Sequence, residues 1–225
     1  MKKAQLAMIL RGRGQKYSEA LGIDVSDGET EIFKWLVASL LFGAPISEAT
    51  AIKTYRCFQK RGVLTPAKML KTGWNGLVSI LDEGGYARYD YKTADKITEV
   101  MKNLTTEYSC NLNLIHDKAV DSHDLEERLK DLGKGIGEVT VSIFLRDLRG
   151  VWGKAEPKPT NLEILAGEKL GILEGGASAE EALVTLRAYW SENRVAGYSF
   201  VNFETALLRI GRELRKKRKR SDPAA

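Results

Sequence analysis

Hydrophobic residues along this chain recur three or four positions apart, the spacing that places them on one face of an α-helix. The pattern is clearest at residues 32–41 and returns at residues 94–104 and 200–214. No segment alternates between apolar and polar residues as a half-buried strand does. The chain is therefore predicted to be all-α, with about ten helices.

Several helix boundaries can be read directly from capping residues. Ser47 is a suitable N-cap, and Thr65 precedes a proline at the first helical position, where the missing amide costs no hydrogen bond. Residues Thr160–Glu163 and Ser178–Glu181 have the capping-box form. Gly84-Gly85 is a helix stop, and Ser122 is expected to open a helix that runs to Asp131.

The composition is that of an ordinary globular protein, with 43% hydrophobic and 29% charged residues in a chain of 225. The longest apolar run, residues 35–42, is much shorter than the ~20 residues that span a bilayer, and the N-terminus lacks a signal-peptide pattern. An intracellular protein with no membrane partner is therefore expected. Cys57 and Cys110 are expected to be ordinary free thiols.

The charge balance is basic, with a net charge of +5 and a pI near 9.1. Much of the excess lies in residues 212–220. Such a run fits either a polyanionic partner or a solvated tail. Residues 215–225 are predicted to form a flexible basic tail.

The most informative stretch is the glycine-rich turn from Leu132 to Thr140. Three glycines at alternate positions permit a tight turn, and Ile136 between them can pack into the core. The helix that follows starts near Gly137, so its free amides and positive dipole end form an anion site. The alternatives are a helix–helix corner without a ligand and, less well supported because no strand precedes it, a dinucleotide site. The flanking helices and the nearby Lys130 and Lys134 favour DNA phosphate.

Four segments, in this order, resemble the helix–hairpin–helix DNA glycosylase superfamily, in its endonuclease III-like branch. They are Phe33–Leu41, the turn Gly84-Gly85-Tyr86 followed by Lys92 and Lys96, the hairpin within Leu129–Leu145, and Asn202–Gly211 before a basic segment. None is decisive alone. Their order and spacing make the resemblance specific.

The resemblance implies a two-lobed helical fold with an inter-lobe cleft. The central lobe would be residues 28–145, with the motif at about 124–148, and the second lobe residues 1–27 plus 146–214. The implied partner is double-stranded DNA with a damaged or mismatched base, which is flipped into the cleft. A monomer is expected, in the cytoplasm with the nucleoid in a prokaryote or in the nucleus of a eukaryote.

The same resemblance assigns roles to individual residues. Tyr86 would line the base pocket or, as the alternative, sit at the edge of the core. The residues expected to contact DNA are Gly133, Lys134, Gly135, Gly137, Thr140, Lys217 and Arg218.

This sequence departs from the family pattern at the residues that carry chemistry. The catalytic aspartate of the family is missing, and Glu156 is the nearest carboxylate that could stabilise positive charge on the sugar. The alternatives are that Glu156 is an exposed loop residue, or that Asp147 takes this role. Val139 stands where bifunctional relatives have their lyase lysine, so that step is excluded. Lys134 or Lys154 could replace it but better fit phosphate contacts. The cysteines of the family's iron–sulfur cluster are absent, so neither a metal nor a cofactor is expected.

Three hypotheses follow. The first is a base-excision-repair glycosylase without the lysine-dependent lyase step, with Glu156 as its catalytic carboxylate. The second is a catalytically inactive helix–hairpin–helix protein that binds damaged or structured DNA. The third is a helical protein–protein adaptor with a basic tail, in which Gly135 and Gly137 would not affect DNA binding.

Overall fold

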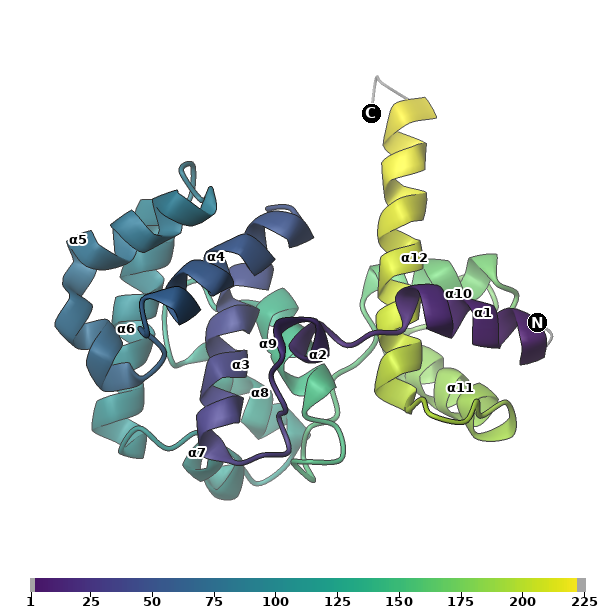
Figure 1. The fold of residues 1–225 in the computed structure, drawn as a ribbon. Coiled ribbons are helices and arrows are strands. Elements are labelled where there is room, and N and C mark those ends of the chain that lie inside the picture. The colour runs from purple at the N-terminus through teal and green to yellow at the C-terminus, as the bar shows by residue number, and fades with distance from the viewer. Residues whose placement is uncertain (1–2, 222–225) are drawn as a thin grey trace. The chain divides into compact units, whose positions relative to one another are not determined.

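The computed structural model describes residues 3–221, and in this range the chain is helical with no strand (Figure 1). The all-α prediction is therefore confirmed. By its internal contacts the chain packs as two compact units. We call residues 21–157 the central unit, and residues up to 20 together with those from 158 onward the terminal unit.

The central unit reaches beyond the predicted range of 28–145 at both ends, so Glu156 belongs to the same unit as the hairpin. It contains α3 to α9, while the short α2 (Tyr17–Leu21) lies at its boundary with the terminal unit. The helices are α3 (Glu29–Phe42), α4 (Glu48–Lys60), α5 (Pro66–Gly84), α6 (Asp90–Tyr108), α7 (Asn113–Lys118), α8 (Ser122–Lys130) and α9 (Glu138–Asp147).

The core of the central unit forms around α3, where Trp35, Val37 and Leu40 are fully buried. The indole Nε1 of Trp35 donates a 3.0 Å hydrogen bond to the carbonyl oxygen of Phe144, which ties α3 to α9. Helices α5 and α6 lie side by side (Figure 1). Helix α5 is kinked at Gly73, whose φ of 70° is not helical.

The terminal unit is built around α12. Its helices are α1 (Lys3–Arg13), α10 (Asn161–Lys169), α11 (Ala179–Glu192) and α12 (Phe200–Ser221). Phe203 stacks on Trp190 with ring centroids 5.6 Å apart, and Leu6 and Leu186 complete the buried cluster around it. Gly211 allows close packing on α10, because a Cβ there would lie 2.0 Å from the carbonyl oxygen of Leu162.

Most of the predicted caps are present. Ser47 and Thr65 accept hydrogen bonds from the amides of the first turns of α4 and α5, and both capping boxes form. One boundary prediction is wrong: the cap of α8 is Asp121, whose carboxylate accepts from the Asp124 amide, and Ser122 is already helical. Aspartate is an equally good cap one residue earlier.

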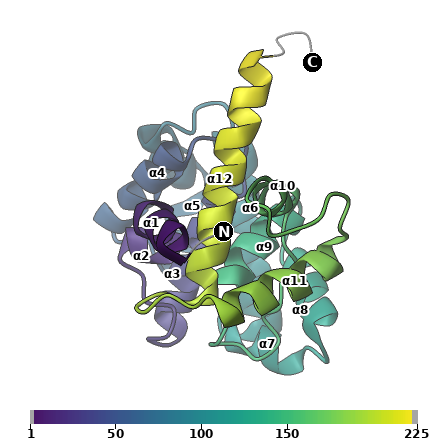
Figure 2. The same cartoon turned by 90° about the vertical axis from the view of Figure 1, so that its right-hand side faces the viewer.

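The basic C-terminal segment is not a flexible tail up to Ser221, because α12 continues as a helix to that residue. Figures 1 and 2 show the second half of α12 extending past the other helices of the terminal unit. No helix within residues 3–221 is long and apolar enough to cross a membrane. Both cysteines are free thiols, as predicted.

Candidate nucleic-acid interface

The segment predicted to be a hairpin is a tight turn between α8 and α9 that contains both buried and exposed residues. Leu132 and Ile136 are only 1% and 8% exposed and anchor the turn in the core. Lys134, Gly135 and Gly137 are exposed. Gly135 has a φ of +87°, a conformation that a side chain would strain. The turn therefore exposes backbone groups on its outer side, while the two buried apolar side chains fix it to the core.

The first turn of α9 is open to an anion. Gly137 is its N-cap, in an extended conformation, and it has no side chain to bind the amides that follow. A Cβ at Gly137 would meet no atom within 4 Å, so the space on this side of the N-cap residue is open. The dipole and the unpaired amides at a helix N-terminus attract negative charge. Glu138, which is also exposed in this turn, works against that attraction.

Two residues predicted to contact DNA lie on the inner side of the motif instead. Gly133 is buried against α6, where a Cβ would be 2.8 Å from a methyl carbon of Val100. Thr140 is 3% exposed, and its hydroxyl lies 2.0 Å from where a Cβ of Gly43 would be. Both positions pack against other helices, so neither residue has the exposed surface that the predicted contact requires. Only the backbone amide of Thr140 remains part of the open turn.

Helix α6 supports the hairpin, a role that our sequence analysis did not foresee. The Lys134 amide donates a 2.9 Å hydrogen bond to the Glu99 carboxylate, and Asn103 Nδ2 donates to the Leu132 carbonyl at 3.1 Å. The Cε atom of Lys96 lies 3.3 Å from the position of a Gly135 Cβ. These three α6 residues recur at helical spacing, but this spacing alone does not say which helix they face.

Glu156 lies in the loop after α9 and forms an ion pair with Arg149. Its Oε2 accepts a 2.9 Å hydrogen bond from Arg149 Nη1, while the other guanidinium nitrogen donates to the Pro157 carbonyl. The Arg149 side chain is 6% exposed and that of Glu156 is 39% exposed. The carboxylate is therefore held in place, and the guanidinium offsets part of its charge. Asp147, the alternative carboxylate, is buried beside Arg146.

The structure also places Tyr86 and Val139, which the sequence analysis singled out. Tyr86 is 1% exposed, and its hydroxyl donates to the Leu41 carbonyl. Burial also raises the pKa of this hydroxyl. Tyr86 is thus a core residue, and its assignment to a base pocket does not fit the structure because no ligand can reach the ring. Val139 is 56% exposed in the first turn of α9.

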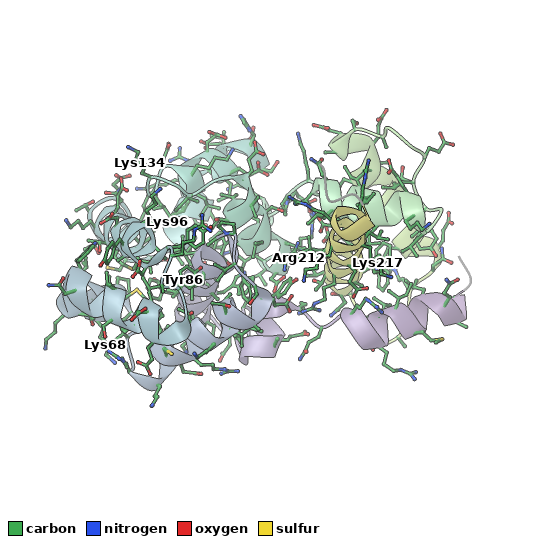
Figure 3. The ribbon with its side chains drawn as sticks, turned by 90° about the horizontal axis from the view of Figure 1, so that it is seen from above. Lys68, Tyr86, Lys96, Lys134, Arg212 and Lys217 are labelled. Carbon is green, nitrogen blue, oxygen red and sulfur yellow. The ribbon has the colours of Figure 1, made fainter. Side chains whose placement is uncertain are left out.

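The arginines and lysines of α12 divide between structural and surface positions (Figure 3). The guanidinium groups of Arg209 and Arg212 lie 4.5 Å and 5.8 Å from the centre of the Tyr17 ring and hold the N-terminal segment on α12. Lys217 and Arg218 are exposed further along the helix. Among residues 212–218, the arginines and lysines of the basic run are therefore exposed from Arg215 onward.

Within residues 3–221, no group of three or more histidine, cysteine or acidic side chains could hold a metal ion. Comparisons with protein-family models, curated proteins and solved structures found no match.

Proposed function

We propose that this protein binds double-stranded DNA by its phosphate backbone, with the turn Lys134–Gly137 and the first turn of α9 as the contact. The observation that supports this most directly is the open, uncapped N-terminus of α9 behind an exposed glycine turn. Backbone amides at such a site bind phosphate without reading the base sequence. The resemblance to helix–hairpin–helix glycosylases supports the same partner, DNA with a damaged or mismatched base.

A matched pair of variants at Gly137 tests this contact. Asp and Asn are both good N-caps and differ mainly in charge, and the extended backbone of Gly137 accepts either. We expect Gly137→Asp to weaken DNA binding about tenfold or more relative to Gly137→Asn, because its carboxylate repels the phosphate. Fluorescence anisotropy with a labelled duplex measures the affinity, and thermal unfolding checks that both variants are folded. Equal affinities of the Asp and Asn variants would rule out the contact.

A second candidate function is removal of the damaged base by hydrolysis of its glycosidic bond. It is favoured by the position of Glu156, a carboxylate fixed by a buried arginine in the same unit as the hairpin. A fixed carboxylate can stabilise the positive charge that develops on the sugar. The exposed valine at position 139 cannot form an imine, so this activity would leave an abasic site and no strand break.

A panel of duplexes with uracil, oxidised, alkylated and mismatched bases separates this candidate from DNA binding without chemistry. If Glu156 is the key carboxylate, wild-type protein releases one of these bases and Glu156→Gln loses about a hundredfold or more of the rate. Glu107→Gln, which changes an exposed carboxylate on α6, serves as the matched control. Lesion-dependent binding without base release would instead support the catalytically inactive protein.

A further inference from the structure

Lys96 occupies an unusual place for a lysine. Its side chain reaches from α6 to the turn, with Cε 3.3 Å and Nζ 3.9 Å from the position of a Gly135 Cβ; Figure 3 labels Lys96 and Lys134. Gly135 is one of the two exposed glycines of the turn that leads into α9. The ammonium group therefore lies beside the same turn that carries the open amides.

The ammonium group of Lys96 has no anionic partner within the described part of the chain. It is half-buried, and burial alone lowers its pKa, with no carboxylate contributing. Withdrawing a charge from water without a counter-ion disfavours the folded state. An anionic ligand beside the ammonium group would offset this cost, and a Met would pack the same stem without the charge.

Glu99, one turn further along α6, makes the need for this cation greater. Its carboxylate already accepts the Lys134 amide at 2.9 Å, so that amide is not open to a phosphate. The carboxylate also adds negative charge close to the turn. A phosphate that approaches Gly135 and Gly137 would therefore need a nearby positive charge in addition to the amides of α9.

We propose that Lys96 is a phosphate ligand of the hairpin, supplied by α6, which binds the same stretch of DNA backbone as the exposed turn and the first turn of α9. This inference rests on the proposed DNA-binding function. It adds a third helix, α6, to an interface that the sequence assigns to α8, the turn and α9. The Glu99–Lys134 contact between α6 and the turn spans 35 residues.

The decisive variant is Lys96→Met, which keeps the stem and removes the charge. We expect it to bind duplex DNA about tenfold more weakly, with a dependence of log Kd on log salt concentration that is shallower by about one. Its Tm should equal or exceed that of the wild type, because the desolvated charge is gone. Lys96→Arg should retain most of the affinity. Lys102→Met removes the same charge from an exposed position on the same helix and should bind like the wild type.

The outcomes distinguish a failure of the Lys96 proposal from a failure of the hairpin contact. Wild-type affinity of Lys96→Met, together with a loss in Gly137→Asp, would overturn the role of Lys96 and leave the hairpin contact in place. A Tm well below that of the wild type would show that Lys96 serves packing and also overturn the inference. If the wild type itself binds no duplex DNA, both proposals fail.

Discussion

At the scale of single residues, the three glycines of the hairpin perform different tasks although they look alike in the sequence. Gly133 permits close approach of α6, Gly135 adopts a positive φ, and Gly137 leaves the start of α9 uncapped. Only the last two are exposed to a ligand. A glycine has no side chain to indicate its surroundings, so its role became clear only from the neighbours that a Cβ would meet.

Asp124 provides a test of how α8, the first helix of the motif, is held at its start. Its carboxylate accepts hydrogen bonds from the Val120 amide at 2.8 Å and from Arg128 Nε at 3.0 Å, and both lower its pKa. A carboxyl group with a lowered pKa in the folded state stabilises the protein above its unfolded pKa of about 3.9 and loses this effect as the pH falls through the folded value.

We therefore expect Asp124→Asn to unfold at a lower temperature than the wild type at pH 7, and this difference to shrink as the pH is lowered from 4 towards 3. Thermal unfolding of both proteins across this range measures the difference. Because Asn keeps an oxygen for the Val120 amide, the remaining effect reports on the charge. A difference in Tm that is independent of pH would contradict this explanation.

At the scale of helices, the sequence was sufficient wherever the signal was local. Capping residues such as Ser47 and Thr65 bind amides three positions away, so the starts of α4 and α5 follow from a few adjacent letters. The same local logic misplaced the start of α8 by one residue, because Asp121 and Ser122 are both acceptable caps. For residues 215–221 the charge pattern suggested a tail, yet α12 continues through them.

The contacts around the candidate site were predictable only in part. The hairpin is continuous in sequence, and the burial of Ile136 follows from its place between glycines. By contrast, Lys96 and Glu99 contact residues of the turn that lie more than 30 positions later in the chain, and the glycine pattern carries no information about their helix. The position of Tyr86 also depends on a contact between residues far apart in the sequence. Its hydrogen bond to the Leu41 carbonyl spans 45 residues and places it in the core.

At the scale of the whole molecule, each unit carries one feature suited to a polyanion. The central unit has the hairpin with Lys96, and the terminal unit has the exposed basic stretch of α12. A net charge of +5 spread over 225 residues gives only weak general attraction to DNA, so such local concentrations matter more. The two features should also differ in kind. In the proposed interface the amides bind one phosphate at a defined place, whereas exposed cations on a helix attract the DNA backbone without regard to position.

The double variant Lys217→Gln, Arg218→Gln tests the part played by α12. We expect it to weaken binding to damaged and undamaged duplexes by the same factor, because charges on phosphate carry no information about the base. The slope of log Kd against log salt concentration should become shallower by up to about two. Lys169→Gln combined with Arg194→Gln removes two exposed charges from the same unit and is the matched control. If both double variants lose affinity equally, the effect belongs to net charge and not to α12. If the first loses affinity only for a damaged duplex, α12 takes part in recognising the lesion, and the division of roles between the units is wrong.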